Sequence, residues 1–180
     1  MILRTSRLVL RPWRESDRAS FTLLNADPEV TWDMGGPLDE AQSDAKFDRY
    51  VATFAQHGFA RLAIEDQQGH FVGYAGIMPS RPDHVLGRHV EIGWRLARLS
   101  WGHGYATEAA QAVLRDAFTR VGATEVLAYT APDNARSQAV MNRLGLRREP
   151  KHDFSTEYNG KMWRGLVWAA AATDGSLTSG

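Results

Sequence analysis

The segment over residues 99–107 has the composition of an anion-binding turn, because two glycines separate a strand pattern from a helix pattern. Gly102 and Gly104 permit a tight turn that exposes backbone N–H groups. The following helix adds unpaired N–H groups and the positive end of its dipole, and Thr107 adds a hydroxyl. Such a helix start suits a pyrophosphate. No Walker A sequence is present, and Thr107 stands where a dinucleotide fingerprint requires glycine, which weakens both nucleotide interpretations and leaves an ordinary Gly-rich turn as the alternative.

A second polar pair follows the next strand pattern. Asn134 and Ser137 lie three residues apart and therefore share one face where a helix begins. The amide of Asn134 and the hydroxyl of Ser137 suit an extended polar ligand. The plain alternative is that Asn134 caps the helix while Ser137 faces solvent.

Taken together, the two motifs resemble those of a known superfamily. The string WGHGYATEAA, followed about one helix later by APDNARSQAVMNRLGL, resembles the GNAT acyl-CoA N-acyltransferases. The segments TSRLVLRPWRESD, TWDMGGP and NGKMWRGLVWA are similar to the RimJ/RimL-like subgroup, the ribosomal-protein alanine N-acetyltransferases. The resemblance implies direct transfer of the acetyl group of acetyl-CoA to a primary amine, either a protein N-terminus or a small molecule. A transferase of longer acyl groups and a non-catalytic acyl-CoA sensor are the alternatives.

The resemblance also implies how acetyl-CoA binds. The pantetheine arm would lie between two splayed parallel strands, with its pyrophosphate on the glycine loop. Two positions depart from the family pattern: Leu99 stands in place of Gln or Arg, and Met141 in place of a Tyr thought to protonate the thiolate. The CoA thiol resembles a cysteine side chain, whose pKa is about 8.5, so turnover does not require a strong acid. The residues expected to bind acetyl-CoA are Trp94, Arg95, Leu96, Trp101, Gly102, His103, Gly104, Tyr105, Ala106, Thr107, Asn134, Ser137 and Met141.

The acceptor amine must lose a proton, so a carboxylate is expected near the thioester. Glu91, on the strand before the loop, is the first candidate, and Glu157 is the second; a surface carboxylate is the alternative role for Glu91. His89 shares a strand face with Glu91 and would tune or replace it. Ser137 is expected to act as a weak proton donor. The resemblance also implies that the backbone N–H near Leu96 stabilises the thioester oxyanion.

The acceptor pocket is expected to hold an ammonium group by charge and by cation–π contacts. Ordinary packing is the alternative for each of its residues taken singly. No metal is expected, since the chain has no cysteine and its six histidines show no metal-ligand spacing. The residues expected to bind the acceptor are Trp32, Asp33, Met34, Tyr158 and Trp163.

Composition limits the other function classes. The 180 residues predict one domain over 1–172, with a flexible tail over 173–180. The 21 Lys and Arg residues balance the 21 Asp and Glu residues, which argues against a nucleic-acid partner and leaves a homodimer open. The charged N-terminal segment and the lack of a long apolar run predict a cytoplasmic protein with no membrane contact.

Periodicity predicts an α+β fold with a mixed, mostly antiparallel twisted sheet flanked by helices. A hairpin turn is expected at Gly69, a loop over 32–37, and a helix capped by Ser16 or Asp17 that ends near Asn25. The splayed parallel strand pair follows only from the family resemblance. Strands are expected over 7–13, 59–65, 71–78, 89–96, 125–130 and 161–171, and further helices over 39–57, 106–121 and 134–144.

Overall fold

The computed structural model describes residues 1–158 and 160–173. Its strands form a nine-stranded sheet in the order β1-β2-β3-β4-β5-β6-β9-β7, and β8 pairs with β9 beside this path. Neighbouring strands are antiparallel except β5 and β6, which are parallel. The predicted α+β class with a mixed, mostly antiparallel sheet is confirmed. The strands are β1 (Leu3–Arg4), β2 (Leu8–Arg11), β3 (Arg61–Asp66), β4 (Phe71–Pro79), β5 (Val90–Leu96), β6 (Glu125–Thr130), β7 (Arg147–Arg148), β8 (Phe154–Tyr158) and β9 (Lys161–Ala171).

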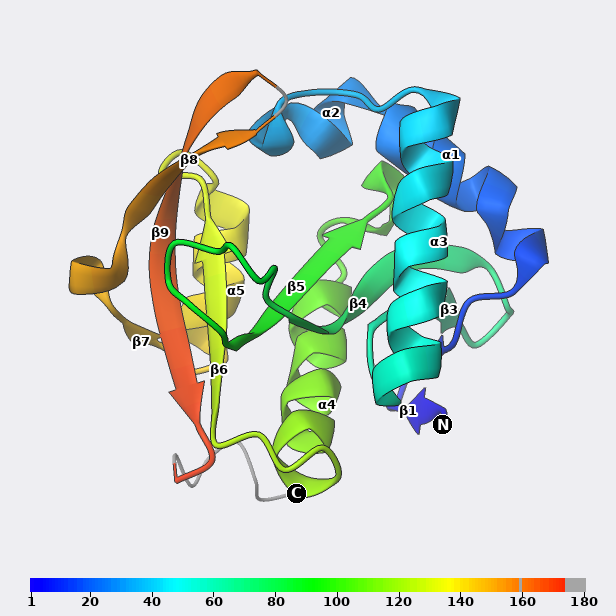
Figure 1. The fold of residues 1–180 in the computed structure, drawn as a ribbon. Coiled ribbons are helices and arrows are strands. Elements are labelled where there is room, and N and C mark those ends of the chain that lie inside the picture. The colour runs from blue at the N-terminus through cyan, green and yellow to red at the C-terminus, as the bar shows by residue number, and fades with distance from the viewer. Residues whose placement is uncertain (159, 174–180) are drawn as a thin grey trace.

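Helices cover both faces of the sheet (Figure 1). Alternate residues of a strand point to opposite faces. On β4, Ala75 and Ile77 join the core under α4, whereas Tyr74 and Met78 join the core under α1 and α3. The helices are α1 (Arg18–Ala26), α2 (Pro28–Thr31), α3 (Glu40–His57), α4 (Tyr105–Thr119) and α5 (Ala135–Arg143), and short 3-10 turns occur at Glu15–Asp17, Trp32–Met34, Arg98–Ser100 and Pro150–His152.

Helix α4 packs closely on the centre of the sheet because its inner face carries small side chains. Ala109, Ala110 and Ala117 are fully buried, and Val113 and Leu114 extend the same stripe. This stripe repeats at the helical period, as the sequence predicts. Its position fixes the start of α4 directly beyond the end of β5.

The parallel pair β5 and β6 separates soon after it forms. The only register pair recorded between them joins Glu91 to Leu127, whereas β4 and β5 share seven register pairs. Figure 1 shows the two strands diverging towards the end of β5 that leads into α4. The splay leaves backbone groups of both strands available to an extended ligand with matching amides.

Several local predictions were wrong. Asp17 precedes α1, but its side chain accepts no N–H group of that helix, because Arg11 at 2.7 and 2.8 Å and the backbone N–H of Arg14 at 2.7 Å engage its carboxylate. The segment 28–34, taken in part as loop, contains α2 and a 3-10 turn. Glu157 and Tyr158 lie on strand β8, which is missing from the predicted strands because β8 finds its partner only in β9.

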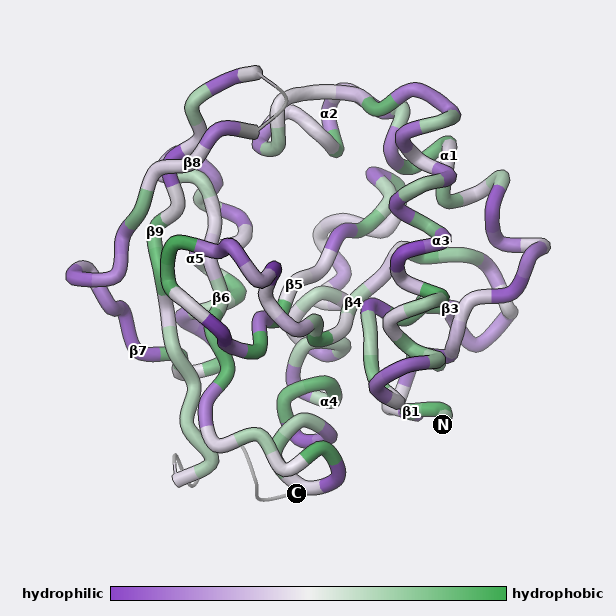
Figure 2. Tube along the Cα trace, viewed as in Figure 1, coloured by the Kyte–Doolittle hydropathy of each residue, from purple (hydrophilic) through white to green (hydrophobic). Residues whose placement is uncertain are grey.

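Hydropathy follows the layers. Most of β6 and the C-terminal half of β9 are pale to apolar, while many hydrophilic residues lie on α3 and the outer turns (Figure 2). In the part of the chain that the structure describes, no helix is both long enough and apolar enough to span a bilayer. Most of the predicted tail, residues 174–180, lies outside the described residues, and the domain boundary at 172 stays a prediction.

Candidate active site

The loop between β5 and α4 has the geometry of an anion-binding turn. Gly102 and Gly104 adopt left-handed backbone conformations, with φ of 79° and 78°, which glycine takes at little cost. Gly104 precedes the first turn of α4 and has no side chain to cap it. The N–H groups of that turn therefore point outward together with the positive end of the helix dipole.

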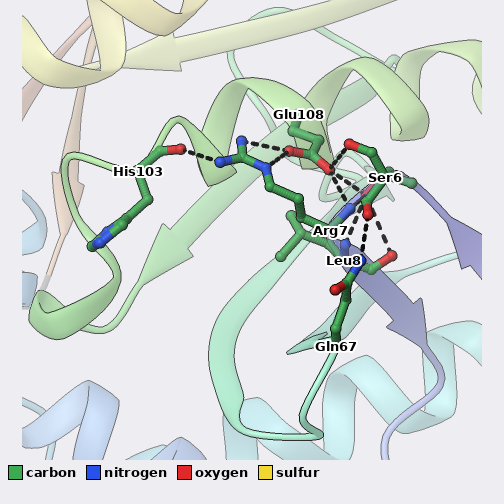
Figure 3. Close-up of polar contacts among 7 residues, drawn as sticks. Ser6, Arg7, Leu8, Gln67, His103 and Glu108 are labelled. Atoms are coloured by element: carbon green, nitrogen blue, oxygen red, sulfur yellow. Dashed lines mark hydrogen bonds and ion pairs between the residues drawn. The ribbon is translucent and has the colours of Figure 1, made fainter.

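Arg7, in the N-terminal segment, bonds both this loop and helix α4 (Figure 3). Arg7 donates from Nη1 to the carbonyl of His103 at 2.9 Å and from Nε to Glu108 Oε2 at 2.7 Å. Glu108 Oε1 also accepts from the hydroxyl of Thr5 at 2.6 Å. Burial opposes ionisation of Glu108, but these bonds outweigh it and lower its pKa. Arg7 and Glu108 thus fix the loop against α4, a role that the sequence analysis missed.

A groove of about 1200 Å³ extends from the loop along the end of β5 to the start of α5. Two of the residues predicted to bind acetyl-CoA lie outside it: His103 stacks on Tyr105 at 5.4 Å, and Met141 lines a second cavity. Arg136, which the sequence analysis overlooked, lines the groove and places its guanidinium 4.1 Å from the ring of Trp101. The predicted residues that line the groove are Trp94, Arg95, Leu96, Trp101, Gly102, Gly104, Tyr105, Ala106, Thr107, Asn134 and Ser137.

The second cavity, of about 370 Å³, lies on the side of the sheet that α3 covers. Glu91, Met34 and Trp163 are among its lining residues. Because Met34 and Trp163 were expected to bind the acceptor, we call this the acceptor-side cavity. Four residues line both the groove and this cavity, and they mark the place where the two meet. These four are Asp33, Trp94, Arg95 and Ser137.

Comparisons with known proteins identify this arrangement. Residues 7–147 match the family model described as acetyltransferase (GNAT) domain. The chain belongs to the GNAT acetyltransferase family. It is 34% identical over 152 residues to the FsC-acetyl coenzyme A-N(2)-transacetylase of Aspergillus fumigatus, and this match covers 80% of the chain and 64% of that protein.

Solved structures agree with this assignment. The acetyltransferase from Agrobacterium tumefaciens has a TM-score of 0.80 and 29% identity, and the match covers 94% of each chain. RimJ of Mycobacterium smegmatis, solved in complex with CoA-disulfide, has a TM-score of 0.71 and 26% identity, over 96% of this chain and 86% of that one. The GNAT fold and the acetyltransferase class predicted from the sequence are therefore confirmed.

In this acetyltransferase, Asp33 is already paired and does not offer a free charge to an ammonium group. Its carboxylate accepts from Arg95 at 3.1 Å and from the amide of Asn134 at 2.8 Å. Its backbone carbonyl accepts from the indole of Trp163 at 2.8 Å. Asp33 therefore joins the 3-10 turn at Trp32–Met34 to β5, α5 and β9, and fixes the junction of the two cavities.

Asn134 caps helix α5, which is the alternative to ligand binding that the sequence analysis named. Its Oδ1 accepts the N–H of Ser137 at 3.1 Å, and its Nδ2 donates to Asp33. Both ends of the amide are thus occupied within the protein. The hydroxyl of Ser137 has no recorded hydrogen-bond partner among the described residues and faces both cavities.

The two candidate bases line the acceptor-side cavity, but their environments differ. Glu91 Oε1 accepts from Arg61 Nη2 at 2.9 Å, and its side chain is 20% exposed. Glu157 is exposed and has no ion pair among the described residues. His89 lines neither cavity; its Nδ1 lies 2.9 Å from the carbonyl of Gly87.

The remaining acceptor candidates divide between the cavities. Trp32 is 47% exposed at the rim of the groove, and Met34 and Trp163 line the acceptor-side cavity. The side chain of Tyr158 lies outside the described part of the structure. Across the described residues, no cluster of three or more His, Cys, Asp or Glu side chains has the arrangement of a metal site.

Tyr74 is a titratable residue of the acceptor-side cavity that the sequence analysis missed. Its strand segment FVGYAGIM is typical of an apolar core, so no local signal marks it. Burial disfavours its phenolate, but the positive charges of Lys46 and Arg95 outweigh that effect and lower its pKa to about 8. Burial raises the pKa of its neighbour Tyr50 well above the usual value.

Proposed function

We propose that this chain transfers the acetyl group of acetyl-CoA directly to a primary amine, and that it is a RimJ/RimL-like member of the family. The observation that carries the proposal is the meeting of a long groove and a smaller cavity at four shared residues. A groove that starts at a helix N-terminus and follows the end of β5, where β5 and β6 splay apart, suits a pyrophosphate joined to a pantetheine arm. The cavity on the other side of the sheet suits the acceptor.

In this mechanism, the amine nitrogen attacks the thioester carbonyl carbon, the C–S bond breaks, and the CoA thiolate takes up a proton. Glu91 accepts the proton that the amine loses, directly or through water, with Glu157 as the second candidate. Ser137 donates to the leaving thiolate because its hydroxyl lies at the junction and has no recorded partner among the described residues. The backbone N–H near Leu96 stabilises the oxyanion.

Ligand binding is tested first. Calorimetry with acetyl-CoA is expected to give a micromolar dissociation constant. Saturation at about 100 times that constant should stabilise the fold by about 2.7 kcal/mol, which is visible as a raised melting temperature. Longer acyl-CoA donors in parallel test the acyl preference. A folded sample that does not bind acetyl-CoA would overturn the proposal.

Turnover is tested with a thiol reagent. The chain contains no cysteine, so such a reagent detects only released CoA. Amino acids, polyamines and an alanine-terminated peptide serve as acceptors, and Ser137→Ala should lower turnover by about tenfold or less. Binding of acetyl-CoA without amine-dependent release across this panel would show a binding protein and refute direct transfer.

A further inference from the structure

Cationic side chains outnumber carboxylates in the lining of the acceptor-side cavity. Five cationic and four carboxylate side chains line it, drawn from α3, three strands, the loop before β5 and the 3-10 turn at Trp32–Met34. An ammonium acceptor would be expected to meet free carboxylates instead. The cations are Lys46, Arg49, Arg61, Arg81 and Arg95, and the carboxylates are Asp33, Asp83, Glu91 and Glu157.

The best-placed carboxylates are engaged by arginine. Asp33 bonds Arg95 at 3.1 Å, and both side chains are less than 15% exposed. Glu91 bonds Arg61 at 2.9 Å, with 20% and 8% of the two side chains exposed. Asp83 and Glu157, the other two carboxylates, are exposed. The inner part of the cavity therefore has little negative charge left for an incoming ammonium.

Three of the five cations, Lys46, Arg49 and Arg81, form no ion pair among the described residues, and Lys46 is the one of these three that is not exposed. Its Nζ donates to the amide oxygen of Asn25 at 3.1 Å and lies 5.5 Å from the ring centroid of Tyr74. No carboxylate forms an ion pair with it among the described residues. Burial lowers the pKa of its ammonium, and a nearby anion would favour the charged form.

Tyr74 lies beside two of these cations, Lys46 and Arg95. Tyr74 is buried, yet Lys46 and Arg95 lower the pKa of its hydroxyl. Tyr74 and Arg95 are register neighbours on β4 and β5, and Arg95 lines both cavities. The positive centre is thus one strand away from the junction where the acetyl group would be transferred.

We infer that the acceptor is a small amino acid-like molecule whose carboxylate, a few bonds from the reacting amine, binds Lys46. The inference rests on the proposed function, since it assigns the substrate class of the same site. A carboxylate would receive charge-assisted bonds from the Lys46 ammonium and restore charge balance beside Tyr74. A polyamine would instead place a second cation against Lys46, and a protein N-terminus would bring no carboxylate close to its amine.

The test compares acceptors that differ only in the carboxylate. Phenylalanine, its amide and phenethylamine form one series, and alanine, its amide and ethylamine form a smaller one. We expect kcat/KM for the carboxylate member to exceed those of its partners by about 10-fold or more, the loss typical of a missing charge-assisted bond. Equal or better use of the amides, the simple amines or a polyamine would overturn the inference while leaving direct transfer intact.

Variants locate the effect at Lys46. Lys46→Met keeps much of the side-chain volume, and Lys46→Arg keeps the charge. Lys46→Met should lower kcat/KM for amino acids about 10-fold or more, with the loss mainly in KM, and Lys46→Arg should restore part of it. The exposed Lys151→Met is the matched control for removal of one lysine charge. Equal losses for the amides and for the amino acids in Lys46→Met would refute a carboxylate contact.

A binding measurement keeps the inference testable if the acceptor panel shows little turnover. N-acetylphenylalanine and N-acetylphenethylamine are titrated by calorimetry into the protein saturated with CoA. Tighter binding of the carboxylate compound, lost in Lys46→Met but kept in Lys151→Met, supports the inference. Equal binding of the two compounds overturns it. Melting temperatures show that each variant is folded, and failure of acetyl-CoA itself to bind would instead refute the proposed function.

Discussion

Gly104→Val provides a sharp test of the anion-binding loop. Gly104 has φ of 78°, a conformation that a β-branched residue strongly disfavours, and a Cβ there would lie 3.5 Å from Arg7 Nη2. Gly122 is a matched control, because its φ is 76° and its Cβ would meet nothing within 4 Å, outside the groove. Valine at either position is expected to lower the free energy of unfolding by about 1–3 kcal/mol.

The two variants should differ in ligand affinity. Relief of the strain at Gly104 turns the backbone of the loop and misdirects at least one N–H group that faces the pyrophosphate. A hydrogen bond to a charged group contributes about 1.5–3 kcal/mol. Its loss corresponds to an increase of about 10- to 150-fold in the dissociation constant. Gly122→Val has no such bond to lose, so its affinity should match that of the unsubstituted protein.

The assay is calorimetry of acetyl-CoA at a temperature where melting curves show both variants to be folded. The expected result is weakened binding in Gly104→Val alone. If Gly104→Val binds acetyl-CoA as tightly as Gly122→Val, the loop does not hold the pyrophosphate. If both bind equally weakly, loss of stability and not loop geometry explains the effect.

Three further predictions address the base, the loop support and acid stability. Glu91→Gln should lower kcat about 100-fold with little change in acetyl-CoA affinity; an unchanged rate and pH profile would remove Glu91 as the base. Arg7→Ala should raise the KM for acetyl-CoA several-fold. Because the Arg7 side chain is 46% exposed, the same change should lower the free energy of unfolding by at most about 1 kcal/mol. An unchanged KM would show that the loop keeps its shape without Arg7. Burial raises the pKa of Asp17, but bonds from Arg11 and the backbone of Arg14 outweigh it and leave the pKa lowered. The contribution of Asp17 to the free energy of unfolding is therefore fully present above its unfolded pKa of about 3.9 and lost as pH falls below that value. If the urea midpoint of Asp17→Asn declined as steeply with acid as that of the unsubstituted protein, this prediction would be contradicted.

Local pattern predicted the elements whose burial repeats along one segment. The stripe of Ala109, Val113 and Ala117 specifies a helix because i, i+3 and i+4 positions share one face. Gly69, with φ of 83°, confirms the hairpin turn between β3 and β4. The glycine loop was found for the same reason, since the residues that shape it are adjacent in sequence.

Such local patterns could not predict contacts between segments that are distant in the sequence. Arg7 bonds Glu108 across 101 residues, and Trp163 bonds Asp33 across 130 residues. Strand β8 is short, and only its pairing with β9 makes it a strand. No spacing rule relates positions so far apart, because the fold alone brings them together.

The sequence by itself determined the fold class, the glycine turn before α4 and the family, because glycine placement and hydrophobic period act within a few residues of the chain. The tertiary structure decided which charged side chains already have a partner of opposite charge within the protein. Asp33 has the residue type expected of an amine-binding group, yet Arg95 and Asn134 engage it. Lys46 resembles an ordinary surface lysine in the sequence, yet it enters the acceptor-side cavity without a carboxylate partner among the described residues. Charge balance depends on distances of a few ångströms in three dimensions, and the fold sets those distances.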